Sequence, residues 1–187
     1  MKFKKLSILF CSLLALTSVM AVSAAETETV SETEAASAEE STVSGADEET
    51  EYPITIQHAY GETVIESKPE RIATVGWENQ DAPLALGIAP VGVSAANYGM
   101  VTENNLHPWT DEAFQELGVD APNVFDDVDG LDFEAISDCD PDVILASYSG
   151  LTQEDYDTLS QIAPVIPYKE NAWQTTWRDQ TIENAWG

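Results

Sequence analysis

Residues 131–168 constrain the fold of this chain more than any other stretch of it. The run at 143–146 is apolar without polar alternation, which is typical of a strand buried on both faces of a parallel sheet. A short amphipathic helix that buries Phe133 and Ile136 is predicted before this strand. Pro141 ends that helix, because its ring removes a backbone N–H and disfavours helical geometry in the residue before it.

A second helix and a second strand follow within the same stretch. Thr152 is a good N-cap for this helix, and Pro164 ends it just before a strand that starts at Val165. Strand, helix and strand in this order predict a right-handed βαβ unit with parallel strands. Because ligands of open α/β sheets bind outside the carboxyl ends of the strands, the loop at 147–150 is the first candidate for a functional site.

The rest of the sequence continues this alternation of strands and helices. It predicts a β-hairpin at 52–67, strands at 71–76, 90–93 and 123–125, and helices at 82–87, at 110–118 and from 175 onward. The helix at 110–118 is expected to be capped by Thr110 or Asp111 and to end at Gly118. Its inward side chains are expected to be Phe114 and Leu117. Together these elements predict an α/β fold: a single Rossmann-like lobe whose central, mostly parallel sheet is flanked by helices and preceded by the hairpin.

The chain begins with the features of an export signal. Three lysines form a basic start, residues 6–22 are apolar, and small residues follow. This pattern predicts a secretory signal peptide at residues 1–25. The alternatives are an uncleaved membrane anchor and a lipid attached to Cys11; the first is disfavoured by the short apolar run and the second by the bulky residue before the cysteine.

Residues 26–51 are rich in Glu, Thr, Ser and Ala and contain no Lys or Arg. Such a composition cannot bury enough apolar surface to fold, so a disordered acidic linker is predicted. It is interpreted as a spacer between an envelope surface and a folded module, with a solubilising tail as the alternative.

The charge of the chain excludes some classes of partner. The formal net charge is −27, and removal of the predicted signal peptide would take away three of the seven basic residues. Nucleic acid, whose binding needs phosphate neutralisation, is therefore not an expected partner, and anionic lipid surfaces are disfavoured. Cys139 would then be the only cysteine, so no internal disulfide is expected.

Several fragments of the folded part carry a resemblance to a known family when their order and spacing are taken together. They are HAYG at 58–61, PERI at 69–72, ALGIAPVGV at 85–93, LDFEAI at 131–136, PDVIL at 141–145, YSGLTQEDY at 148–156 and IAPV at 162–165. With them the chain resembles the amino-terminal half of substrate-binding proteins of ABC importers for ferric siderophores. That class has two lobes joined by a long helix.

The resemblance implies a division of the chain. Residues 52–172 are expected to form the amino-terminal lobe, and residues 173–187 to begin the helix between the lobes. The second lobe is expected to be missing from this chain, so the chain alone should bind its ligand weakly or not at all. An iron(III)–siderophore ligand, the permease subunits of an ABC importer as partners, a monomeric state and export to the periplasm or cell surface are all implied by the resemblance.

The resemblance also implies a ligand cleft at the carboxyl ends of the strands. The residues expected there are Trp77, Tyr98, Trp109, Ser147, Tyr148 and Trp173. Aromatic faces suit flat, polarisable metal chelates, and hydroxyl groups suit their polar rim. The alternative for each aromatic side chain is packing in the core. Few basic side chains are available, so either the other lobe supplies them or the ligand is not strongly anionic.

Glu134 matches the position at which members of the family place a carboxylate that docks onto arginines of the permease. A charge of this kind mainly steers and orients an encounter. The alternative is an ordinary exposed glutamate on a helix.

Direct metal binding and catalysis are less favoured by the sequence. His58 and His107 are the only histidines and are expected to be structural, so no metal ligands are assigned and iron should arrive inside its chelator, without a further cofactor. No catalytic residue is assigned, because no nucleophile elbow, phosphate loop or CxxC motif is present. The alternatives left open are a binding protein for cobalamin, haem or another metal chelate, a secreted α/β enzyme, and a secreted interaction module.

Overall fold

The structure is a computed structural model that describes residues 50–185. The predicted signal peptide lies outside these residues, as does the predicted acidic linker except for its last two positions. Among the described residues, no helix combines the length and the apolar character needed to cross a membrane.

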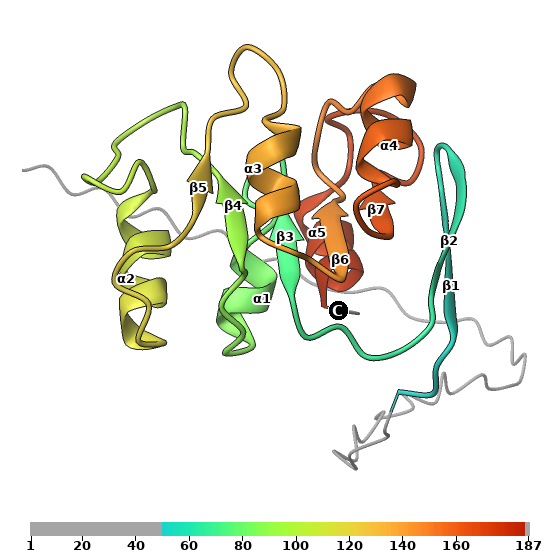
Figure 1. Ribbon diagram of the computed structural model, residues 1–187, viewed down its shortest axis with the longest axis horizontal. Coiled ribbons are helices and arrows are strands. Elements are labelled where there is room, and N and C mark those ends of the chain that lie inside the picture. The colour runs from blue at the N-terminus through green and yellow to red at the C-terminus, as the bar shows by residue number, and fades with distance from the viewer. Residues whose placement is uncertain (1–49, 186–187) are drawn as a thin grey trace, which may run out of the picture. The chain divides into compact units, whose positions relative to one another are not determined.

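The core is a sheet of five strands in the order β5-β4-β3-β6-β7 (Figure 1). The strands are β3 (Ile72–Thr74), β4 (Gly92–Ser94), β5 (Val124–Phe125), β6 (Val143–Ala146) and β7 (Val165–Pro167). Every neighbouring pair is parallel. All four residues of β6 are buried, as the apolar run predicted. The predicted parallel sheet is therefore confirmed.

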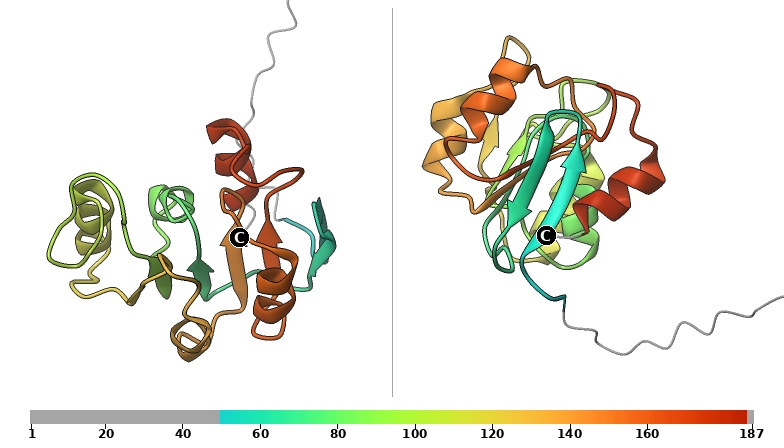
Figure 2. Two further views of the ribbon diagram at one scale, coloured as in Figure 1. Left: turned by 90° about the horizontal axis from the view of Figure 1, so that it is seen from above. Right: turned by 90° about the vertical axis from the view of Figure 1, so that its right-hand side faces the viewer.

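Within residues 50–185 five helices accompany the sheet, with α3 and α4 on one face and α1 and α5 on the other (Figure 2). They are α1 (Asp81–Ala85), α2 (Pro108–Glu116), α3 (Phe133–Asp138), α4 (Gln153–Leu159) and α5 (Trp177–Asn184). Ile136 of α3 and Leu159 of α4 share one buried cluster with Ile144 of β6. Thr152 caps α4 through a reciprocal pair of hydrogen bonds with Asp155, which confirms the cap expected there.

The predicted hairpin is also confirmed. It consists of β1 (Ile54–His58) and β2 (Gly61–Ile65), paired antiparallel from Ile54↔Ile65 to His58↔Gly61. Ile65 is buried in a cluster that includes Val143 of β6 and Ile166 of β7. The hairpin therefore packs against the part of the sheet that α3 and α4 do not cover (Figure 2, right).

Two helix boundaries differ from the prediction. In α2 the N-cap is His107 and Pro108 is the first helical residue, so Thr110 and Asp111 lie inside the helix. Proline is pre-organised for this first position because its φ is fixed near the helical value. Leu117 is the C-cap and is 38% exposed instead of buried, because it follows the last helical turn. The last helix, α5, begins later than the predicted boundary at residue 173.

Candidate functional site

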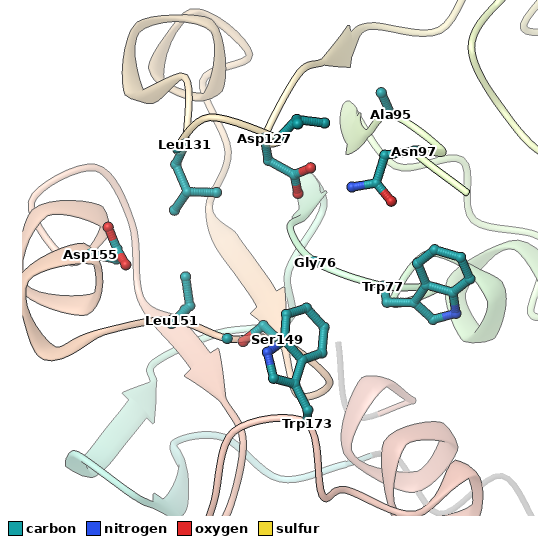
Figure 3. Close-up of a pocket in the computed structure, with 13 residues that line it drawn as sticks. Gly76, Trp77, Ala95, Asn97, Asp127, Leu131, Ser149, Leu151, Asp155 and Trp173 are labelled. Atoms are coloured by element: carbon teal, nitrogen blue, oxygen red, sulfur yellow. The ribbon is translucent and has the colours of Figure 1, made fainter.

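The order of the strands creates a point at which two loops diverge. The strands β3 and β6 are neighbours in the middle of the sheet. From β3 the chain continues to β4, toward one edge of the sheet, and from β6 it continues to β7, toward the opposite edge. A crevice forms at such a switch point, outside the carboxyl ends of the two strands. In this structure it is a hollow of about 580 Å³, bordered by the loops that follow all five strands (Figure 3). Its lining includes Trp77, Asn97, Asp127, Ser149, Asp155 and Trp173.

Two of the predicted site residues, Trp77 and Trp173, line this hollow. Trp173 has a φ of 58°, and its ring lies so close to Gly150 that a Cβ at that glycine would come within 2.5 Å of Nε1. Gly150 is therefore required for the present position of the indole. Strained backbone at a non-glycine residue is concentrated at functional sites, where the surrounding structure holds it in place.

The other predicted aromatic side chains gather around these two tryptophans. The Trp77 ring lies 6.3 Å from that of Tyr98 and 5.5 Å from that of His107, which stacks on Trp109 at 4.4 Å. Tyr148 meets Trp173 edge to face, with 5.4 Å between ring centroids. Tyr98, Trp109 and Tyr148 do not line the hollow itself. The structure thus brings the predicted aromatics to one end of the sheet, but only Trp77 and Trp173 into the cavity.

Ser147 does not lie where the sequence placed it. Its side chain is fully buried, with Oγ 3.0 Å from Asn79 Oδ1 and 2.9 Å from Asn184 Oδ1. The residues of this loop that border the hollow are Ser149, Gly150 and Leu151, and the Oγ of Ser149 donates to the carbonyl of Ala146. Ser147, the first residue after β6, is covered by α5 through Asn184. No local sequence pattern predicts this contact.

Sequence reasoning also missed the carboxylates of the hollow. Asp127 and Asp155 line it, and of its lining residues in the described part of the chain none is Lys or Arg. Asp155 accepts from the backbone N–H and hydroxyl of Thr152, at 2.9 and 2.7 Å, so part of its charge is already engaged. Figure 3 shows Asp127 and Asn97 across the opening from Trp173. The acidic turn at 126–130 was the available clue to Asp127.

One carboxylate, that of Asp81, lies close to the aromatic group formed by Trp77, Tyr98, His107 and Trp109, and its pKa is shifted. Burial raises the pKa of Asp81 from 3.8 to about 6, and the charge of Glu78 adds to the shift. Glu78 itself has a φ of 55°, directly after Trp77. The Asp81 carboxylate beside the aromatic group therefore loses its negative charge as the pH falls below about 6.

Both histidines have structural surroundings. His58 is buried, which lowers its pKa; its Nδ1 accepts from the N–H of Tyr60, and its Nε2 lies 2.9 Å from Thr63 Oγ1. His107 is also buried and its Nδ1 lies 3.2 Å from the carbonyl oxygen of Met100. Within residues 50–185 no group of three or more His, Cys, Asp or Glu side chains is arranged to hold a metal ion.

Glu134 lies in the first turn of α3 and is exposed. The side chain of Asp132 caps this helix by accepting from the N–H of Ala135, at 2.9 Å. The Glu134 carboxylate is therefore free of the capping role and accessible from solvent.

Comparison with known proteins places these features in context. Residues 72–185 match the periplasmic binding protein family. The chain is 29% identical over 172 residues to a probable siderophore-binding lipoprotein, YfiY, of Bacillus subtilis strain 168, covering 87% of this chain and 43% of that protein.

Solved structures show the same similarity. The iron uptake ABC transporter substrate-binding protein PiaA of Streptococcus pneumoniae TIGR4 is 53% identical, with a TM-score of 0.64 over 71% of this chain and 43% of that chain. PiaA in complex with ferrichrome gives 55% identity and a TM-score of 0.66, over 71% of this chain and 44% of that one. SirA of Staphylococcus aureus, complexed with staphyloferrin B, is 28% identical with a TM-score of 0.55, over 72% and 42% of the two chains. This chain therefore spans less than half the length of these relatives.

Proposed function

Because the chain belongs to the periplasmic binding protein family, we propose that it supplies one lobe of an extracytoplasmic protein that captures an iron(III)–siderophore for an ABC importer. The observation that carries the proposal is the hollow at the switch point, walled by Trp77 and Trp173 and open to solvent. Indole faces suit the flat, polarisable arms of a metal chelate. The relatives that bind ferrichrome and staphyloferrin B support the same class of ligand.

The charged residues that line the hollow indicate which class of ferric chelate it would accept. A ferric chelate with three hydroxamate arms is neutral, because each arm carries one negative charge against Fe(III), whereas three catecholate arms leave a net negative charge. The lining carboxylates Asp127 and Asp155 would repel an anion, and no basic lining residue offsets them among the described residues. We therefore propose a neutral hydroxamate chelate as the ligand that this lobe accepts best.

The relatives are more than twice as long as the part that this chain matches, and the additional part would affect how tightly the ligand is bound. This chain covers 43% of the B. subtilis relative, and we propose that a second lobe of that kind closes over the hollow. Contacts from one lobe alone would then give weak binding. Export and delivery to a membrane permease are part of the same proposal.

Titration of the chain with ferric ferrichrome, followed by tryptophan fluorescence, tests the proposed ligand. Saturable quenching is expected, and a ferric tris-catecholate should bind about tenfold more weakly or worse because of charge repulsion. Iron-free ferrichrome and free tryptophan amide control for chelation and for light absorption by the complex. Equal or tighter binding of the catecholate would contradict the proposed class. Because one lobe is expected to bind weakly, the titration extends to about millimolar ligand, and no saturable binding of any ferric chelate in that range would contradict the proposed function.

Substitution Glu134→Arg tests the proposed docking to a permease. In a protein that also carries the second lobe, whole-cell uptake of labelled ferric siderophore is expected to be lost, because the charge that orients the encounter is reversed. Ligand affinity in the fluorescence titration should stay the same, since Glu134 does not line the hollow. Glu66→Arg, an equal charge change at an exposed residue beyond β2, is the matched control and should leave uptake intact. Normal uptake by the Glu134→Arg protein would rule out this role.

A further inference from the structure

A buried polar cluster joins α5 to the two loops that diverge at the switch point. Asn79, Ser147 and Asn184 are 0%, 0% and 2% exposed. They belong to the loop after β3, the loop after β6 and the last turn of α5. Buried polar side chains are tolerated only when they are hydrogen-bonded, so the cluster is a specific connection between three segments that are distant in sequence.

Asn79 holds the loop after β6 through both backbone groups, the N–H and the C=O, of one residue, Tyr148. Its Nδ2 donates to the carbonyl oxygens of Val75, at 2.7 Å, and Tyr148, at 3.1 Å. Its Oδ1 accepts from the N–H of Tyr148, at 3.1 Å. Two carbonyls face Nδ2 and an N–H faces Oδ1, so only this orientation of the amide satisfies all three partners. Tyr148 is thereby fixed relative to the end of β3.

Two residues of α5 complete the connection. Asn184 Nδ2 donates to Oδ1 of Asn79 at 3.0 Å and to its backbone oxygen at 3.2 Å, while Asn184 Oδ1 accepts from Ser147. Gln180, one turn earlier, donates through Nε2 to the carbonyl of Trp77 at 2.9 Å and to Asn79 Oδ1 at 3.2 Å. The helix is therefore attached to both loops through amide groups.

Both tryptophans of the hollow are attached to the loop that Asn79 holds. The N–H of Trp77 donates to the carbonyl of Tyr148 at 3.0 Å, and the N–H of Trp173 donates to the carbonyl of Ser149 at 3.1 Å. A shift of this loop would thus move the two indoles relative to each other. Neither Asn79 nor Asn184 lines the hollow.

From this arrangement we infer that Asn79 and Asn184 are positioning residues: they set the spacing of Trp77 and Trp173 and couple it to the docking of α5. The ligand part of this inference rests on the proposed function. Its consequence is that any displacement of α5 changes the shape of the hollow, although the helix does not border it.

Hydrogen exchange of the ligand-free chain tests the coupling in the variant Asn184→Ala. The amides of Trp77 and Tyr148 should exchange about tenfold faster or more, because a buried partner of the Asn79 amide is lost. The Ile144 amide of β6, bonded to the carbonyl of Pro164, reports global opening and serves as the reference. Gln180→Ala should act in the same direction, and it keeps the test decisive if Asn184→Ala fails to fold.

Thr181→Ala is the matched control, since this exposed side chain bonds only within its own helix, to the carbonyl of Trp177. It should change neither exchange nor affinity. Exchange at Trp77 and Tyr148 that rises no more than at Ile144 would overturn the coupling.

In the ferric ferrichrome titration, the Asn184→Ala chain should bind about tenfold more weakly, which a purely structural role away from the hollow would not produce. If the parent chain bound no ferric chelate, the proposed function would fail, while the exchange result would still decide the coupling.

Discussion

The double substitution Trp77→Ala, Trp173→Ala is expected to weaken binding of ferric ferrichrome by a factor of about 100 or more. Truncation of a large aromatic anchor in a binding site commonly costs about 2 kcal/mol or more, and about 1.4 kcal/mol corresponds to a factor of ten in affinity. Each single substitution should cost about tenfold or more by the same reasoning. The two tryptophans stand in different loops but line the same hollow, so both losses fall on one ligand.

The measurement is isothermal titration calorimetry, because both fluorescent reporters of the hollow are removed by the substitutions. Trp177→Ala is the matched control: this residue is 76% exposed on α5 and does not line the hollow. Its affinity should equal that of the parent chain. A double variant that binds as tightly as the parent would show that the ligand lies elsewhere, and would contradict the assignment of the hollow.

The sheet could be predicted from the sequence because its strands carry the pattern themselves. The uninterrupted apolar run of β6 is typical of a strand with both faces covered, and all of its residues are buried in the structure. The hairpin likewise shows its alternation in the sequence, and Ile54 pairs with Ile65 as the pattern requires. Such features depend on neighbours along the chain, so local reasoning is sufficient for them.

The site could be predicted only as far as the ends of the strands. Which side chains face the cavity depends on segments that arrive much later: Ser147 is covered by Asn184, 37 residues further on. Asn79 and Asn184 are 105 residues apart and gave no sequence pattern that distinguishes them from ordinary surface asparagines. Trp77 and Trp173 could be proposed as site residues because they follow strands. Only the three-dimensional arrangement shows that these two line the hollow and that the other predicted aromatic residues do not.

The second large effect is expected for Phe114→Ala, which should lower the free energy of unfolding by about 3–5 kcal/mol. Phe114 is fully buried and packs with Leu84, Val93 and Leu106, which come from α1, β4 and the loop before α2. Removing the ring leaves a cavity that these elements, anchored in different parts of the fold, cannot close by a small shift.

Leu117→Ala is the matched control for this prediction, because it removes an apolar side chain of the same helix end that is already 38% exposed. Its cost should stay below about 1 kcal/mol, and urea unfolding followed by circular dichroism measures both values. Similar losses for the two variants would mean that α2 packs differently from this structure. Because His107 is the residue at which α2 begins and its ring contacts those of Trp77 and Trp109, the Phe114→Ala chain should also lose order in the aromatic group beside the hollow. The stability of this core and the shape of the proposed ligand site are therefore linked through a single helix.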